Sequence, residues 1–561
     1  MLRLVSNSSL RPTHVVRLAS NSKSRSSHQT LLTTAKQLRF NSSKSKTTTT
    51  TTTIFTKKND NEPTSSTSAP AKPTYRVNDA SCFPEDAADA TSTILADAID
   101  FQRRIQGKDR VTWWEILTNE AKRKKEGKVS DSFTIDDVKS SVVSERTRAD
   151  GFSFLTLPFK NDESLRDFYI NAAGRLRFGH LFQDLDALAG RVAAQHCKPA
   201  EPMNVTASID RIYVTRKIDE ISKYDYVLVG YVAYTGRSSM EISIKGFSYE
   251  ENTPKEITPD IVTKDAANCF LSANFTFVAR NPKTHKAHPV NKILPTNETE
   301  WIDYKRAESH NASKKMRAKL ESLDKVPPTE SESKMIHSLY NSTKAINQLQ
   351  KKPENVHFMD TTKISATQIQ QPQYRNRHGV IFGGYLLRQT FELAYCTAGA
   401  FAKSYPRFIS LDNVTFKAPV PVGCVLLADS EVCYTEHIHD PKDDPSPSVQ
   451  TLNTIVKDFD TSANVLSEDS SEYFSVPGTL IQVKVNTKIR NLNDDPDKLV
   501  ESGTFVYSFF VARDGNGEYD QPGYCSVIPE SYSEMIDYVE GRRRAYETAS
   551  YAQQLRLTGH H

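Results

Sequence analysis

The pattern of apolar and polar positions predicts two long helices, each followed by a set of strands. The segments LFQDLDALAGRVAAQHC and LLRQTFELAYCTAGAFA carry apolar residues at helical spacing. Alternating stretches rich in β-branched and aromatic residues follow both helices, which is typical of strands. They read VTASIDRIYV, YVLVGYVAYT, SMEISIKGF and CFLSANFTFVAR in the first set, and FISLDNVTFKA, CVLLADSEVCYT, LIQVKVNTKI and GTFVYSFFVAR in the second. One helix before several antiparallel strands predicts an α+β fold in which each sheet wraps around its helix.

Matching landmarks indicate that these two units are copies of one domain. Asn171 and Gly174 precede the first helix with the same spacing that Asn376 and Gly379 have before the second. Ser-Ile-Asp and Ser-Leu-Asp segments then start a strand in each unit, and a Tyr-Thr pair ends the next one. The offset between copies drifts only from 205 residues at the Asn positions to 200 at the Tyr-Thr pairs. Landmarks in one order over such a distance indicate a duplicated domain rather than a short repeat.

The composition of the segments outside the two units predicts the rest of the domain organisation. Residues 1–59 contain Arg, Lys, Ser and Thr but no Asp or Glu, which is typical of a mitochondrial transit peptide, although a basic disordered tail would also fit. We divide the chain into a transit peptide (1–45), a disordered Ser/Thr/Pro-rich linker (46–80), a helical N-terminal arm (81–164), the first unit (165–295), an exposed, charged helical connector broken at Pro327-Pro328 (296–355), the second unit with an acidic insertion at 436–475 (356–545), and a tail (546–561).

Composition also excludes several classes of function. The net charge of +4 is too small to indicate nucleic-acid binding, and no apolar run approaches the roughly 20 residues of a membrane span. The seven cysteines form no CxxC pair, so we expect neither a disulfide framework nor a zinc site. No metal and no cofactor are predicted, and a reducing compartment fits the cysteines better than an oxidising one.

The adjacent glycines Gly383 and Gly384 open the second helix and are candidates for chemistry. A helix N-terminus presents unpaired amides and the positive end of a dipole, and glycines allow a ligand oxygen to approach that backbone. Such a place suits an anion or a carbonyl that becomes one, with a carboxylate from a facing helix as base or nucleophile. Close contact between helix and sheet would explain the glycines equally well.

A resemblance to a known family favours the chemical interpretation of these glycines. Several segments of the chain together resemble the tandem hotdog-fold acyl-CoA thioesterases, in particular the mitochondrial members and their fungal relatives. The resemblance covers the chain from about residue 165 onward. It rests on NRHGVIFGG at 376–384, RFGHLFQDLDALAG at 177–190, VTASIDRI at 205–212 and GYVAYTGRSSMEI at 230–242. It implies two tandem hotdog domains, each with a central helix wrapped by an antiparallel sheet.

The resemblance also implies a composite active site. One hotdog domain gives Asn376 and its partner gives Asp186, which would activate water, while the amides of Gly383 and Gly384 polarise the thioester carbonyl. Arg237 and Ser238 stand at a turn where this family often meets CoA phosphates. The equivalent second site lacks its acid. Asn171 is kept there, but Phe391 occupies the place of the carboxylate and Glu392 comes one residue later.

Other interpretations of single residues stay open at this point. Asp184 competes with Asp186 for the catalytic place, and Asn376 could instead cap a helix or a turn. The turn at Arg237 and Ser238 could be solvated. Two histidines have simpler structural explanations, His196 as a contact at a helix end and His378 as a loop residue. Cys197 and Cys396 are expected at core positions of the two helices.

These observations predict a mitochondrial matrix acyl-CoA thioesterase that releases free fatty acid and CoA. The alternative is a catalytically inactive hotdog scaffold or acyl-CoA-binding protein of a mitochondrial complex. The partners that we expect are the acyl-CoA substrate and further copies of the chain. The resemblance implies a homo-oligomer, for example a trimer of double hotdogs.

Overall fold

The structure is a computed structural model. It describes residues 137–320, 326–352, 356–376, 379–438, 478–495, 497–512 and 525–557. All of these lie in the larger of two compact units, 83–561. The predicted transit peptide, linker and first part of the arm, most of the acidic insertion, and His378 lie outside the described residues. Every helix in the described ranges is too short or too polar to cross a bilayer.

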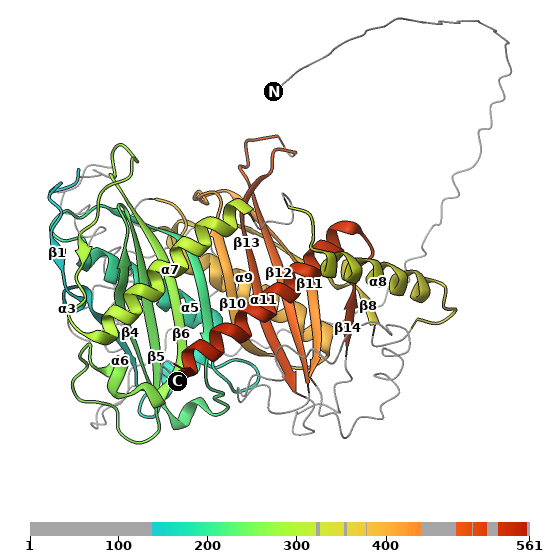
Figure 1. Ribbon diagram of the computed structural model, residues 1–561, viewed down its shortest axis with the longest axis horizontal. Coiled ribbons are helices and arrows are strands. Elements are labelled where there is room, and N and C mark those ends of the chain that lie inside the picture. Colours follow the sequence, from blue (N-terminus) through green and yellow to red (C-terminus); the bar gives the residue numbers. More distant parts are fainter. Residues whose placement is uncertain are drawn as a thin grey trace, which may run out of the picture. The chain divides into compact units, whose positions relative to one another are not determined.

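One antiparallel sheet of ten strands forms the centre of this unit (Figure 1). The eight strands predicted from alternating patterns are all present, and a short strand is added at each edge. In spatial order the strands are β2 (Ser153–Leu157), β4 (Asp225–Thr235), β5 (Ser239–Tyr249), β6 (Cys269–Arg280), β3 (Met203–Val214), β10 (Arg407–Phe416), β13 (Val500–Ala512), β12 (Gly478–Arg490), β11 (Val425–Ile438) and β9 (Ile364–Ile369).

The two halves of this sheet are related by an approximate twofold symmetry. They meet where β3 pairs with β10, and the pairs include Ser208 with Thr415 and Tyr213 with Ser410. Ser208 and Ser410 are 202 residues apart, and so are Tyr213 and Thr415, so exchanging the copies turns one pair into the other. The register of the central pair therefore reproduces the repeat found in the sequence.

Two long helices, α5 (Phe178–His196) and α9 (Gly383–Ala402), lie against one face of the sheet and against each other (Figure 1). Both bury an apolar face, as their 3.6-residue periodicity predicts, and most of the residues that they bury join one core with the inner side chains of both half-sheets. The α+β class is confirmed.

The opposite face of the sheet is covered by α7 (Glu298–Leu320) and α11 (Tyr532–Leu557) (Figure 1). The two helices are equivalent elements of the repeat: Tyr304 of α7 contacts Tyr234 with ring centroids 5.2 Å apart, and Tyr538 of α11 contacts Tyr434 at 4.9 Å. The connector is less exposed at α7 than predicted, since Ala307 on the inner face of this helix is fully buried, while Trp301 and Ile302 are exposed. The expected tail is also largely helical, because α11 continues to Leu557.

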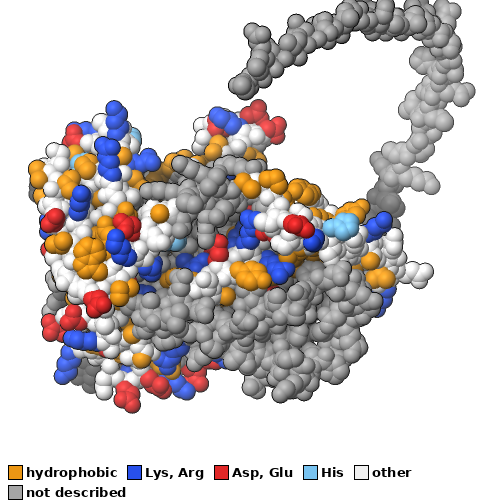
Figure 2. Space-filling model, in the orientation of Figure 1, with side chains coloured by type: hydrophobic (Ala, Val, Ile, Leu, Met, Phe, Trp, Pro, Cys, Tyr) orange, Lys and Arg blue, Asp and Glu red, His pale blue; other side chains and the backbone are white. Residues whose placement is uncertain are grey.

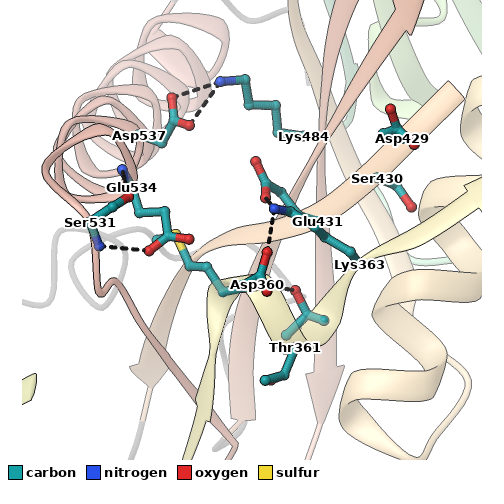
Figure 3. A network of polar contacts seen from close by, with 12 residues as sticks. Asp360, Thr361, Lys363, Asp429, Ser430, Glu431, Lys484, Ser531, Glu534 and Asp537 are labelled. Atoms are coloured by element: carbon teal, nitrogen blue, oxygen red, sulfur yellow. Dashed lines mark hydrogen bonds and ion pairs between the residues drawn. The ribbon is translucent and has the colours of Figure 1, made fainter. Parts of the chain in front are cut away.

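Ion pairs as well as aromatic contacts attach these helices. Lys484 of β12 contacts both carboxylate oxygens of Asp537 in α11, at 2.7 and 2.9 Å (Figure 3). Beside this pair, Lys363 bridges Asp360 and Glu431. Acidic and basic side chains are interspersed on the solvent side of this face (Figure 2).

Shorter elements complete the described part of the chain. The predicted helical arm contains strands as well as helices, because β2 joins the edge of the sheet. The remaining bounds are β1 (Glu145–Arg146), α3 (Arg148–Gly151), α4 (Glu163–Tyr169), η1 (Ile221–Lys223), α6 (Ile261–Lys264), η2 (Ala266–Asn268), β7 (Lys292–Ile293), α8 (Glu330–Asn347), β8 (Val356–Phe358), η3 (Met359–Thr362), η4 (Pro372–Tyr374) and β14 (Ser526–Ile528).

Candidate active site

A tight turn precedes each long helix and explains part of the Asn-x-x-Gly pattern. In the second copy the N–H of Asn376 donates to the carbonyl of Val380 at 2.6 Å, and Gly379 adopts a φ of +78°. In the first copy the side-chain oxygen of Asn171 accepts the N–H groups of Ala173 and Arg175 at 2.9 and 3.0 Å. An Asn side chain that supports its own turn is one of the expected alternatives. The side-chain oxygen of Asn376 accepts the N–H of Val380 at 3.4 Å, so its NH₂ group is the part that would meet a ligand.

The N-terminus of α9 lies directly against Asp186 of α5. The N–H of Gly384 donates to Oδ2 of Asp186 at 2.6 Å, and the Asp186 side chain is fully buried. Asp186 belongs to the first copy and Gly384 to the second, so this contact needs the long helices of both copies. The structure thus brings together two of the residues that the sequence indicates as one site.

The close approach leaves little room for a side chain at Gly383 and less at Gly384. A β-carbon on Gly383 would lie 3.1 Å from Oδ2 of Asp186. A β-carbon on Gly384 would lie 2.8 Å from the Phe382 ring and 3.0 Å from both Cβ of Asp186 and Cα of Gln183. Bare backbone at these positions therefore serves two purposes, since it allows α5 and α9 to cross closely and it exposes helix amides to a carboxylate.

The environment of Asp186 suits a group that exchanges a proton near neutral pH. Burial raises the pKa of Asp186 from 3.8 to about 6, and hydrogen bonds from Thr206 and Gly384 partly oppose this increase. No charged group contributes to the shift. A carboxyl group of this kind is ionised at the pH of most cell compartments but is a stronger base than an exposed Asp.

Thr206 is a site residue that the sequence analysis did not single out. Its hydroxyl donates to Oδ1 of Asp186 at 2.9 Å, so both carboxylate oxygens have a hydrogen-bond donor. Thr206 stands in β3, whose pairing with β6 shifts between Thr206 and Ser208. This β-bulge turns Thr206 toward α5 while Ser208 faces the opposite side, where it contacts α7. Plain alternation would place both on one face, so the pattern alone did not reveal Thr206.

The equivalent second site is filled by aromatic side chains. A β-carbon added at Gly179 would lie 3.0 Å from the ring of Phe391, which occupies the place of Asp186, and 2.9 Å from Oε1 of Glu392. The place of Thr206 is taken by Phe408, and the two rings meet edge to face at 5.5 Å. A hydrogen-bonded polar pair in one copy is therefore an aromatic pair in the other. Glu392 instead forms an ion pair with Arg177 at 2.8 Å.

The competing residues have structural partners elsewhere. Asp184 accepts a hydrogen bond from Tyr169 at 2.6 Å, and ring nitrogen Nε2 of the buried His196 contacts the carbonyl of Asn291 at 2.8 Å. Burial raises the pKa of the Cys197 thiol to about 12, as expected for a core cysteine. Cys396 differs from the prediction of a core position, because it lies on the exposed side of α9.

The turn at Arg237 and Ser238 joins β4 to β5 and is held through its carbonyl groups. Ser238 accepts from Ala279 at 2.8 Å and Arg237 from Val290 at 3.1 Å. No described contact links either side chain to Asp186. Strand register nevertheless places the turn at the same end of the sheet as Thr206, since Thr206 pairs with Phe277 and Phe277 with Met240, at the start of β5.

One group in the described part of the chain has the composition of a metal site. Ligand atoms of Asp210, Glu241 and His310 lie within 4.8 Å of one another on the face covered by α7. The Lys314 ammonium group contacts Asp210 there, and Arg306 lies 3.5 Å from Glu241. Because these two cations already neutralise the two carboxylates, the group is an ion-pair cluster.

Comparison with known proteins identifies relatives of this chain. Over 306 residues it is 34% identical to acyl-coenzyme A thioesterase 2, chloroplastic, of Humulus lupulus, a match that covers 53% of this chain and 66% of that one. It is 32% identical over 304 residues to acyl-coenzyme A thioesterase 9, mitochondrial, of Mus musculus, covering 53% and 66%. The chain is similar in sequence to these acyl-CoA thioesterases.

The matches to these acyl-CoA thioesterases span slightly less than two thirds of each relative's length. The acyl-CoA hydrolase from Staphylococcus aureus, solved with butyryl coenzyme A and coenzyme A, aligns with 31% of this chain and 90% of its own at 19% identity and a TM-score of 0.25. No model of a known protein family matches the chain.

Proposed function

We propose that this protein hydrolyses acyl-CoA to a free fatty acid and CoA at one composite site between two tandem hotdog domains. The first domain contributes Asp186 and Thr206, and the second contributes Asn376 and the N-terminus of α9. The observation that carries the proposal is the buried Asp186 carboxylate, which has a raised pKa and lies against helix amides from the other copy. A base beside an oxyanion-binding helix end is what hydrolysis of a thioester requires.

In this mechanism Asp186 removes a proton from water while the water oxygen attacks the thioester carbonyl carbon. The carbonyl oxygen gains negative charge, which the N–H of Gly383 and the positive end of α9 stabilise. The Gly384 amide holds the Asp186 carboxylate, so the oxyanion is assigned to Gly383 rather than to both glycines. The carbon–sulfur bond then breaks, and Asp186 returns its proton to the CoA sulfur. Asn376 would hold the water or the carbonyl through its NH₂ group.

The CoA moiety of the bound substrate would extend from the site toward the β4–β5 turn. Two strand spacings, or about 10 Å, separate Thr206 from the start of β5. Arg237 and Ser238 follow at this turn, and Arg237 is exposed, as a group that binds a phosphate from solvent should be. We therefore keep both residues as proposed contacts of the CoA phosphates.

We place this activity in the mitochondrial matrix. The support is the acid-free N-terminal 59 residues together with a mitochondrial relative. A homo-oligomer, for example a trimer of double hotdogs, is the proposed assembly. Imaging of the full chain fused to a C-terminal fluorophore tests the location, and light scattering of the purified protein tests the assembly.

Release of free CoA, measured with a thiol reagent over a series of acyl chain lengths, tests the activity. Replacement of Asp186 by Asn should abolish turnover, because the amide cannot accept the proton from water. Asp184→Asn is the matched control, since it alters a carboxylate two residues away on the same helix, which accepts a hydrogen bond from Tyr169. Full activity of Asp186→Asn, or no CoA release by the wild-type protein with any substrate, would favour the inactive scaffold.

A further inference from the structure

The strand that carries Thr206 is held on its opposite face by one side chain of α7. The Lys314 ammonium group donates to Oγ of Ser208 at 2.5 Å and also contacts Oδ1 of Asp210. Asp210 is almost fully buried and further accepts from the hydroxyl groups of Ser208 and Thr276, at 3.1 and 2.9 Å. Lys314 is the cation that neutralises this carboxylate.

The residues that Lys314 contacts belong to the irregular part of β3. Pairing with β6 shifts between Thr206 and Ser208 and again between Ile209 and Arg211, so that Asp210 has no cross-strand partner in β6. Bulges of this kind redirect side chains, and the first of them turns Thr206 toward Asp186. The network around Asp210 therefore holds β3 directly C-terminal to the bulge that directs Thr206 into the site.

The other copy has an equivalent register shift in β10, between Phe408 and Ser410, but its strand is held without a lysine from the covering helix. Its corresponding acid, Asp412, is bound by Arg211 at 2.6 Å and by Ser410 and Thr548 hydroxyl groups at 2.8 and 3.3 Å. The helix there contributes a neutral Thr548, where α7 contributes a lysine. That strand presents Phe408 instead of a hydroxyl group, so no hydrogen bond to a carboxylate needs to be aligned. The ammonium contact occurs on the strand that has a polar site residue to position.

We propose that Lys314 is a positioning residue for thioester hydrolysis, which acts from the outer face of the sheet by fixing the β3 bulge and thereby the Thr206–Asp186 hydrogen bond. This inference rests on the proposed function. It gives the connector between the two domains a role in activity, since α7 would hold one wall of a site that it does not touch.

The test compares Lys314→Met with Lys314→Arg and with Lys305→Met in the full-length chain. Lys314→Met keeps the alkyl stem and removes the charge, Lys314→Arg restores the charge, and Lys305 is an exposed residue of the same helix that pairs with Glu308. We expect Lys314→Met to lower kcat by about tenfold or more, because small displacements of a catalytic group are costly. The arginine variant should recover most of this loss, and Lys305→Met should behave as wild type.

A pH profile separates positioning from a general loss of folded protein. The Thr206 hydrogen bond lowers the pKa of Asp186, so its loss should move the acid limb of kcat/KM to higher pH in Lys314→Met. Adding Lys314→Met to Thr206→Val should produce no further displacement of the limb, because both changes break the same link. An unchanged acid limb, failure of arginine to restore the rate, or additive effects of the two changes would overturn the inference. Activity of Asp186→Asn would instead overturn the proposed function.

Discussion

The N–H of Gly383 should be the group that stabilises the oxyanion, and replacing this residue by proline tests that assignment. Gly383 is the first residue of α9, a position where proline is well tolerated because its nitrogen needs no partner within the helix. The preceding Phe382 has φ −69° and ψ 135°, which is the extended conformation that a residue before proline prefers. Proline should therefore remove one N–H with little disturbance of the backbone.

The matched control is Gly383→Ala. Both replacements add a β-carbon, which would lie 3.1 Å from Oδ2 of Asp186 and 3.5 Å from the Phe416 ring, but alanine keeps the N–H. Among the described residues no hydrogen bond involves this N–H, so its loss should not itself reduce stability.

Loss of one oxyanion donor typically costs about 2.7–4 kcal/mol of transition-state stabilisation, or about 10²–10³ in kcat. In an assay of CoA release, we expect kcat of Gly383→Ala to exceed kcat of Gly383→Pro by this factor. The two variants should have similar KM values and similar melting temperatures. Equal kcat values for two well-folded variants would refute the assignment of the oxyanion to Gly383. A lower melting temperature in the proline variant alone would show that the helix end had been disturbed.

Three further outcomes follow from the same geometry. First, kcat/KM should fall as the pH is lowered through about 6, where Asp186 becomes protonated, and a profile flat to pH 4.5 would contradict its role as base. Second, the pKa of Asp186 in the folded state lies above the ordinary 3.8, so ionisation of this group destabilises the fold at pH values above about 6 and not below about 4. Replacing Asp186 by Asn should therefore raise the free energy of unfolding at pH 8 by up to about 3 kcal/mol and leave it nearly unchanged at pH 4. Urea denaturation at the two pH values measures this difference. Third, Phe391→Ala should cost about 3–5 kcal/mol of stability, because it opens a cavity in a buried aromatic cluster; a cost below 1 kcal/mol would mean that this site is not a well-packed core.

Much of this architecture could be predicted because it rests on local patterns. Alternation located eight strands, helical periodicity located α5 and α9, and the repeat indicated that Phe391 stands where Asp186 does. Composite contacts were predictable only through the resemblance, since nothing in the spacing of Asp186 and Gly384 shows that the two helices cross there.

What the sequence did not reveal depends on exceptions to regular periodicity. The bulge in β3 changes which face Thr206 occupies, so counting alternate positions misplaces it. The α7 helix was predicted to be exposed because it is strongly charged, yet its charges pair with buried groups on the sheet, as Arg306 does with Glu241 of β5 at 3.5 Å. A charged sequence cannot show whether its partners are water or buried ions.

The division of one site between two copies in a single chain has a consequence for how such a protein can diverge. In a pair of identical subunits, a change from Asp to Phe on the long helix would remove the acid from both sites at once. Covalent linkage makes the two positions separately mutable, so Phe391 could become part of the core while Asp186 kept a costly buried charge. One half of the molecule is thus free to gain stability at a place where the other half must give it up for chemistry.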